Sequence, residues 1–498
     1  MADDSSGKTG LASLRSVADG ASLHYVGTLV VNVSGFLLNL VLTRTLGASV
    51  YGIYAYGTMV LASVLTFANF GTDVSATRYL SANHDNRAYQ NRTLGLAYLT
   101  TIAISVLIAA ILYVAAPTIN AYTLEEPLFT PAMQVFAIAL PFQALVHIVS
   151  STFRGLERAV DKTVVMVLGP TLQLVAVVAA VAVGYSLLGV AAAYALACLM
   201  AFLIAIWYAF WRTNLRPSVE FDRQEVADFY NYSAPLSLSK ASSFLFKRVD
   251  VFMVGIFLTS ASVGIYNIAV LIAGIIAMPL IGINQLFPPV ASRLYAEDDR
   301  GQLESVYETV TRWSITASLI VALPLVVYRT EVLALFGPEF VAGTAVVTLF
   351  VAGQLFNAAA GPANDLLTMT DHQYVVMTNH LVLGVGNVVL NYYFILEFGL
   401  VGAAIATAGV LASLNVVRAL QVWYLEGLVG YSVDLWKPLA ATAASAFVMF
   451  VVGLYLGGLV AVVVGSAAGV GTFLAALYRF GLEEQDVELA GDYLELMS

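Results

Sequence analysis

Charged side chains gather in one apolar stretch of this sequence. Residues 233–258 are long enough to span a bilayer, and they contain Lys240, Lys247, Arg248 and Asp250. A charged side chain at bilayer depth costs at least ~2.5–3.5 kcal/mol, so it normally faces a wet cavity or a partner. Three cations and one acid on such a span predict an interior that attracts anions, as in a transporter for a negatively charged substrate.

The spacing of these residues brings them near one face of a helix. Lys240 and Lys247 are seven residues apart, and Asp250 follows three residues later. An arginine holds two phosphate oxygens at once, whereas a lysine acts as a point charge. We therefore predict a substrate-binding site for a phosphate or head group at Lys240, Lys247, Arg248 and Asp250, with the acid orienting the cations. The alternative is a structural ion pair between Asp250 and Lys247 or Arg248. The remaining cations would then extend their aliphatic chains so that their charged groups reach the membrane surface.

Composition assigns the chain to the membrane. Hydrophobic residues make up 60% of the 498 positions and charged residues 11%, against ~25% charged in soluble domains. The single cysteine, Cys198, excludes a disulfide within the chain and a thiolate metal site. The sequence contains no P-loop and no catalytic constellation. We expect no enzymatic activity, no cofactor, no metal and no nucleic-acid partner.

Apolar runs of spanning length recur along the whole chain and predict about 14 transmembrane helices of ~20 residues each. They begin near residues 23, 50, 93, 129, 163, 187, 233, 262, 313, 343, 374, 400, 439 and 458. With a cytoplasmic N-terminus, 16 basic residues fall in inner segments and only Arg44 and Arg329 in outer loops. This asymmetry follows the positive-inside rule, so both termini are predicted to be cytoplasmic.

Short motifs recur at a nearly constant distance. The paired stretches are Gly52-Ile53-Tyr54 with Gly264-Ile265-Tyr266, Ala76-Thr77-Arg78 with Ala291-Ser292-Arg293, and Leu188-Gly189-Val190-Ala191 with Val401-Gly402-Ala403-Ala404. Their offsets are 212, 215 and 213 residues. We predict two parallel six-helix repeats that form two lobes around a central cleft, with two extra C-terminal helices. Parallel repeats are related by an axis along the membrane normal, and rocking of the two halves exposes the cleft between them alternately to each side.

These patterns divide the chain into six predicted segments. They are a cytoplasmic N-terminal segment (1–22), an N-lobe of helices one to six (23–211), a cytoplasmic linker (212–232), a C-lobe of helices seven to twelve (233–425), helices thirteen and fourteen (426–479), and an acidic cytoplasmic tail (480–498).

The pattern resembles the oligosaccharide flippases of the polysaccharide transporter family, in the superfamily that also holds multidrug and toxin extruders. The residues that carry the resemblance are Gly47 with Tyr51-Gly52, Asn69-Phe70-Gly71 before Arg78-Tyr79, Arg248-Val249-Asp250 with Gly255, Val263-Gly264-Ile265-Tyr266, and Ala291-Ser292-Arg293. The chain departs from the pattern at Gly71-Thr72-Asp73, where an apolar residue more often follows the glycine.

The resemblance implies export of a polyprenyl- or dolichol-(di)phosphate-linked oligosaccharide across the cytoplasmic membrane by alternating access. The product would serve glycoprotein or surface-polysaccharide assembly. Implied partners are membrane lipids and glycan-assembly enzymes, with the chain acting as a monomer. Acidic residues exceed basic ones by 32 to 22, and this lysine-poor, acidic balance indicates a haloarchaeal source.

Uncharged polar side chains form further stripes on the predicted helices. They are Asn32 and Asn39, Gln354 and Asn357, and Asn387 and Asn391. Such stripes line a cavity for a sugar, or they form hydrogen bonds between helices.

Three other functions remain as alternatives. A cation-coupled multidrug or metabolite antiporter of the sister family needs an acid embedded in the first lobe, but residues 23–43 contain none. A membrane glycosyltransferase needs a sizeable loop with paired acids, and the outer loops are short. A scaffold for glycan assembly would have little use for charges inside the membrane.

Overall fold

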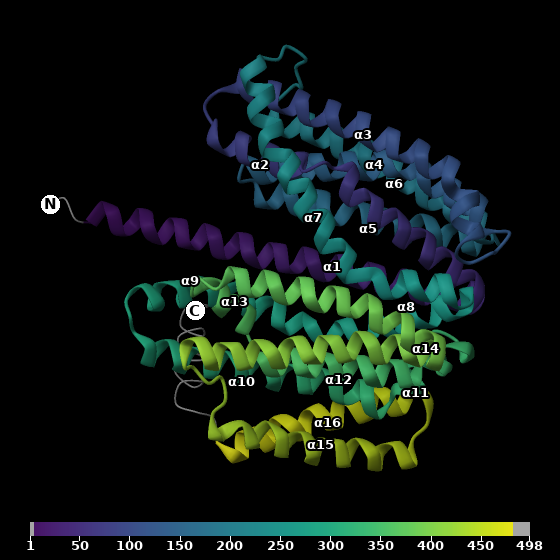
Figure 1. Ribbon diagram of the computed structural model, residues 1–498, viewed down its shortest axis with the longest axis vertical. Helices are drawn as coiled ribbons and strands as arrows, with labels where there is room; N and C mark the ends of the chain where they lie inside the picture. The colour runs from purple at the N-terminus through teal and green to yellow at the C-terminus, as the bar shows by residue number, and fades with distance from the viewer. Residues whose placement is uncertain (1–3, 482–498) are drawn as a thin grey trace. The chain divides into compact units, whose positions relative to one another are not determined.

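The structure is a computed structural model that describes residues 4–481, with side chains for 24–237, 249–280 and 287–481. These residues form helices joined by turns, without a β-strand among them (Figure 1). The helices are α1 (Asp4–Ala68), α2 (Thr72–Ala82), α3 (Arg87–Ala121), α4 (Phe129–Gly155), α5 (Ala159–Ala182), α6 (Leu187–Thr213), α7 (Arg223–Phe257), α8 (Ser260–Gly274), η1 (Ile275–Ala277), α9 (Met278–Ala296), α10 (Arg300–Val327), α11 (Arg329–Ala334), η2 (Pro338–Gly343), α12 (Thr344–Ala360), α13 (Ala363–Met369), α14 (Gln373–Glu426), η3 (Val433–Leu435), α15 (Trp436–Tyr455) and α16 (Gly458–Phe480).

Within the described residues, eleven helical segments are long and apolar enough to cross a membrane. Two of them, in α1 and α14, are interrupted by non-helical backbone at Gly47 and Gly399. Each therefore contains two of the predicted spans, which gives 11 + 2 = 13 stretches, and α7 covers the predicted seventh helix. The prediction of an all-α integral membrane protein is confirmed, and the count of fourteen stays a prediction.

Backbone conformation repeats along the chain with the same spacing as the sequence motifs. Seven described residues of the first half have a positive φ, and four of them have a counterpart in the second half at the spacing of the sequence motifs. The pairs are Glu125 and Gly337, Glu157 and Asp371, Gly184 and Gly399, and Asn214 and Gly427. Their offsets are 212, 214, 215 and 213 residues. Helix ends therefore recur in step with the motifs, as two copies of one helical unit require.

The chain divides into two compact units, Met1–Gly264 and Ile265–Ser498. In the first unit α4 packs against α1, α2, α3, α5 and α6, and Figure 1 shows α3, α4 and α6 side by side. Large side chains such as Phe129, Phe136 and Phe153 are fully buried along α4. In the second unit α12 packs against α10 and α14, and α15 packs against α16. Helix α4 is thus the central element of the first unit.

The predicted linker is docked onto α3 over much of its length. Residues 214–222 are non-helical, and Asn91 accepts hydrogen bonds from the backbone N–H of Ser218 (2.9 Å) and of Arg216 (2.8 Å). A Cβ on Gly95 would lie 1.7 Å from the carbonyl oxygen of Ser218, so only glycine permits this approach. Helix α7 then begins at Arg223 and packs against α1, α2 and α3. The first unit therefore includes α7, and the predicted lobe boundary between 232 and 233 stays a prediction.

Helix α1 meets the start of α8, residues 260–264 of the first unit, at two glycines. A Cβ on Gly52 would lie 1.8 Å from the carbonyl oxygen of Ser260, and one on Gly264 would lie 2.4 Å from that of Ala48. Because 48 + 212 = 260 and 52 + 212 = 264, the two contacts are equivalent under the repeat. Ser49 and Ser260 add a hydrogen bond between their hydroxyls at 2.8 Å. Small residues allow this backbone contact inside a membrane.

Substituting Gly52 by valine should push α1 away from the backbone of Ser260. The added side chain collides with backbone, which cannot rotate away, so we expect destabilisation of about 1–3 kcal/mol or more. The measurement is thermal unfolding of the purified protein in detergent. Gly35→Ala in the same helix is the matched control, because a Cβ there meets nothing within 4 Å. Equal melting temperatures for the two variants would contradict the crossing.

Candidate functional site

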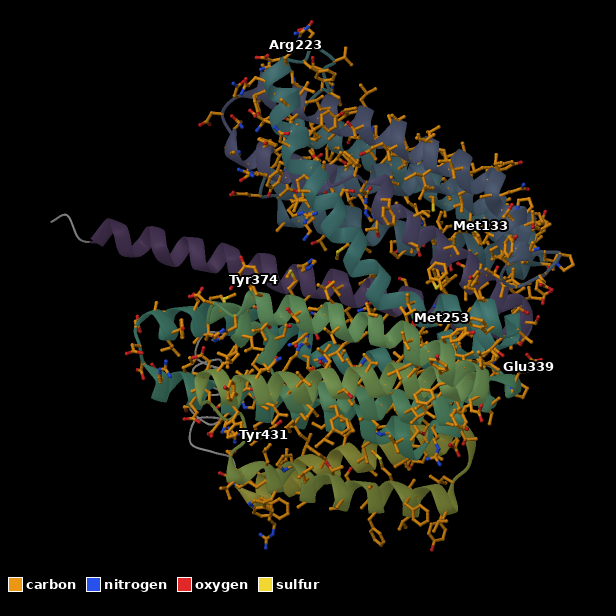
Figure 2. The ribbon with its side chains drawn as sticks, viewed as in Figure 1. Met133, Arg223, Met253, Glu339, Tyr374 and Tyr431 are labelled. Atoms are coloured by element: carbon orange, nitrogen blue, oxygen red, sulfur yellow. The ribbon has the colours of Figure 1, made fainter. Side chains whose placement is uncertain are left out.

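The predicted head-group residues lie on α7. Figure 2 shows Arg223 at the start of this helix and Met253 near its other end, so the predicted cluster lies along the helix between them. The side chains of Lys240, Lys247 and Arg248 lie outside the described residues. Asp250 is buried, at 6% exposure, and its Oδ1 accepts a hydrogen bond from the backbone N–H of Val251 at 2.9 Å. The four-residue site stays a prediction.

The predicted polar stripes differ in how their side chains are used. Asn39 donates to the carbonyl oxygen of Gly35 at 2.7 Å and accepts from the hydroxyl of Tyr51 at 2.6 Å. Asn391 is fully buried, and its Nδ2 donates to the Oδ1 of Asn387 at 2.8 Å. These three asparagines therefore take part in packing within their own unit.

The other members of the stripes lie at partly open positions. Asn32, Gln354 and Asn357 are half-buried. None of the six stripe residues lines the cavity of the first unit described next. Their predicted role in lining a cleft between lobes stays a prediction.

A cavity of about 390 Å³ lies inside the first unit. Its walls come from α1, α2, α4, α5 and α6. Helix α4 contributes Gln143, His147, Ser150, Ser151 and Arg154. Successive residues of this set are three or four positions apart, except for the adjacent serines, so they lie along one helical face. The cavity is therefore a slot that follows α4.

The two ends of the slot differ in exposure and in polarity. At one end Tyr194 and Cys198 are buried, and at the other His147 and Arg154 are exposed. The amide of Gln143 donates to the hydroxyl of Tyr194, and it lies 3.5 Å from the sulfur of Cys198. Apolar side chains such as Leu65 also line the slot. The slot joins a closed, amide-lined end to an accessible, charged one.

Positive charge concentrates near the accessible end. Arg154 and Lys162 lie within electrostatic range of each other. Asp161 is only 2% exposed, and its carboxylate lies 2.6 Å from Arg158 Nε and 2.9 Å from Arg212 Nε. It also accepts a hydrogen bond from the hydroxyl of Tyr208. This acid is fully engaged by two arginines. The charges that remain near the slot are those of Arg154 and Lys162 and that of Asp73, which lines it.

Sequence reasoning missed a buried arginine in the second unit. Arg418 of α14 is 8% exposed; its Nη1 donates to Asn415 Oδ1 at 3.4 Å, and its Nη2 lies 3.2 Å from His380 Nε2. Its Nε has no hydrogen-bond partner in the described part of the chain, and Asp365 lies within electrostatic range. The signal was available, because Arg418 interrupts the apolar run at 400–425 just as the cations of 233–258 interrupt theirs.

The family described as Polysaccharide biosynthesis protein matches residues 17–294, more than half of the chain. The chain belongs to this family. A second description, MatE, matches residues 235–393. The two matches together extend from α1 into α14.

Curated relatives match parts of the chain. The probable low-salt glycan biosynthesis flippase Agl15 of Haloferax volcanii is 27% identical over 205 residues, covering 40% of this chain and 42% of the relative. The teichuronic acid biosynthesis protein TuaB of Bacillus subtilis is 23% identical over 269 residues, covering 50% of this chain and 52% of the relative. The chain thus spans about half, or less, of the curated relatives it matches.

Solved structures share the fold over most of the chain. The lipid II flippase MurJ in an inward closed conformation matches with a TM-score of 0.72 at 13% identity, covering 92% of this chain and 98% of that structure. An inward-facing multidrug resistance transporter of the MATE family matches with a TM-score of 0.67 at 15% identity, covering 80% and 96%. At these identities the likeness establishes a transporter fold.

Replacing Asp161 by asparagine should destabilise the first unit. Removing one partner of a buried ion pair costs ~3–5 kcal/mol, and we expect about 2 kcal/mol because the two arginines are partly exposed. Thermal unfolding would register the loss. Asp298→Asn is the control, since its side chain is 91% exposed and lies 3.7 Å from Arg300. An unchanged melting temperature for Asp161→Asn would refute a structural role for the ion pairs of Asp161 with Arg158 and Arg212.

Proposed function

We propose that this protein is a flippase that moves a polyprenyl- or dolichol-(di)phosphate-linked oligosaccharide across the cytoplasmic membrane. The match to the Polysaccharide biosynthesis protein family over 17–294 carries the proposal, because it includes the charged segment of α7. The names of Agl15 and AglR, both from Haloferax volcanii, describe probable flippases. A cationic interior suits a substrate with a phosphate between lipid and glycan.

The proposed mechanism is alternating access of two lobes without a chemical step. Lys240, Lys247 and Arg248 bind the phosphate group, and Asp250 orients them. Asn32, Asn39, Gln354, Asn357, Asn387 and Asn391 lie along the path of the glycan. The protein acts as a monomer among membrane lipids, beside the enzymes that assemble the glycan. A haloarchaeal source agrees with the acidic composition and with the two Haloferax relatives.

The second candidate is a cation-coupled multidrug or metabolite antiporter. The MatE match over 235–393 and the likeness to a MATE transporter favour it. Binding of a coupling cation needs a carboxylate that is not already neutralised by the protein. In the described residues, Asp161 pairs with two arginines and Asp365 lies near Arg418. These pairings support the anionic substrate.

Deleting the gene should trap lipid-linked saccharide on the cytoplasmic leaflet and abolish surface glycan. Wild-type protein restores export, whereas Arg248→Ala should lower it at least tenfold because a charge-assisted phosphate contact of ~1.5–3 kcal/mol is lost. Leaflet-resolved measurement of the lipid-linked pool checks both statements.

The controls distinguish a failure of the proposed binding site from a failure of the proposed flippase function. Arg329→Ala removes an exposed arginine of α11 and should export normally. Arg248→Lys should retain part of the activity, because the point charge remains. Full export by Arg248→Ala would refute the site alone. Unchanged pools in the deletion strain, with altered sensitivity to cationic drugs, would establish the antiporter instead.

The proposed orientation places both termini in the cytoplasm. Thr259, exposed between α7 and α8, should then face outward, and Asp85, exposed between α2 and α3, should face inward. After replacing Cys198 by serine, a cysteine at Thr259 should react with an impermeant maleimide on intact cells. A cysteine at Asp85 should react only after lysis. The reverse pattern would invert the topology.

A further inference from the structure

The cavity of the first unit has a length that suits more than a single small group. Gln143 and Arg154 are eleven residues apart on α4, which corresponds to about 16 Å at ~1.5 Å per residue. The cavity volume of about 390 Å³ falls within the range of ~300–1,000 Å³ of small-molecule sites. Its accessible end is charged and its closed end is uncharged and polar. An occupant that reaches both ends must therefore present two kinds of polar group.

The closed end offers hydrogen-bond acceptors. Gln143 and Gln173, on α4 and α5, each place an amide nitrogen 3.5 Å from the sulfur of Cys198. This fixes both amides with their nitrogens turned toward α6. The Oε1 atoms of the two glutamines accept no hydrogen bond from the described side chains and backbone. They are therefore available to accept from hydroxyl groups of a bound molecule.

The accessible end offers a cation. Among the described residues, Arg154 makes one hydrogen bond, from Nη2 to the Oγ of Ser151 at 3.3 Å, and its side chain is exposed and lines the cavity. Lys162 adds positive charge nearby. The acid of the lining is Asp73. The two cations Arg154 and Lys162 outnumber it, and a net positive charge favours an anion.

We propose that this cavity binds an acidic sugar unit of the transported saccharide, with hydroxyl groups at Gln143 and Gln173 and the acid group at Arg154. This deepens the proposed function and rests on it. An apolar ligand would leave the two amide oxygens unpaired, which is costly in a closed site. A cationic amphiphile would meet Arg154 and Lys162 at the opening. A sugar carrying a carboxylate or a phosphate satisfies both ends.

Cys198 provides a reporter, because it is the only cysteine of the chain and lines the closed end. The experiment measures its alkylation rate by N-ethylmaleimide in purified full-length protein in lipid nanodiscs. Glucuronate, glucose 1-phosphate, glucose and sodium chloride are compared at equal ionic strength. We expect the acidic sugars to slow alkylation in a saturable way, while glucose and salt do not. Protection by glucuronate alone would assign a carboxylate, and protection by the phosphate alone a sugar phosphate.

A matched pair of variants tests the charged end. Arg154→Gln should weaken protection by the acidic sugars about 10- to 100-fold, the effect of losing a hydrogen bond to a charged group. Arg329→Gln is the control, because it too is an exposed arginine, and its one hydrogen bond among the described residues goes to a residue three positions away, at the carbonyl oxygen of Val326. A second reporter, Ser150→Cys in a Cys198→Ser background, repeats the measurement at a half-buried position of the slot.

The outcomes that overturn the proposal are separate from those that overturn the function. Equal protection by glucose and the acidic sugars, or full protection in Arg154→Gln, would refute the acidic-sugar site. Protection at neither reporter by any sugar would do the same. Each of these results leaves leaflet-resolved export unaffected. Loss of the flippase function would appear in the leaflet assay alone, with sugar binding intact.

Discussion

The crossing of α1 and α8 at Gly52 and Gly264 is the constraint on which the first unit depends. Each glycine lies against a backbone carbonyl of the other helix, so the contact tolerates no side chain on either side. The two contacts are related by the 212-residue repeat, which makes the crossing nearly symmetric. Backbone packed directly on backbone fixes the rotation of α1, and with it the direction in which Thr58 and Leu65 face the cavity.

A second constraint is the free-energy cost of placing polar and charged side chains inside a membrane. The described residues reduce this cost in two ways. Asp161 is neutralised by two arginines that extend to the surface, whereas Arg418 is buried with His380, Asn415 and a nearby acid. Asn39 donates to the carbonyl oxygen of Gly35 and Asn391 to that of Asn387, each one turn away on its own helix, whereas the Oδ1 of Asn391 has no partner in the described residues. In the slot along α4, the Oε1 atoms of Gln143 and Gln173 accept no hydrogen bond from the described residues.

Much of the fold could be predicted from the sequence, because the length of an apolar run is a local property of the sequence. Apolar runs located α3 to α6 and the two helices on either side of Gly47, and the 212–215 offsets indicated the repeat that the turns at Glu157 and Asp371 also show. The site was harder to predict. Gln143 and Gln173 are thirty residues apart, and nothing local indicates that both amides turn to Cys198. Arg418 is a single charge in its apolar run, which is a weaker signal than the cluster at 240–250. The docking of 214–222 on Asn91 depends on tertiary contacts that no local pattern indicates.

The docked segment 214–222 has a consequence for engineering the protein. A stretch rich in polar residues between two membrane helices looks like a neutral spacer into which a fluorescent reporter or an affinity tag could be inserted. Here it is bonded to Asn91 and lies against Gly95, so extra residues would pull the start of α7 away from α3. The exposed turn at 83–86, which joins α2 to α3, carries no such contact with the segment and is the better insertion point.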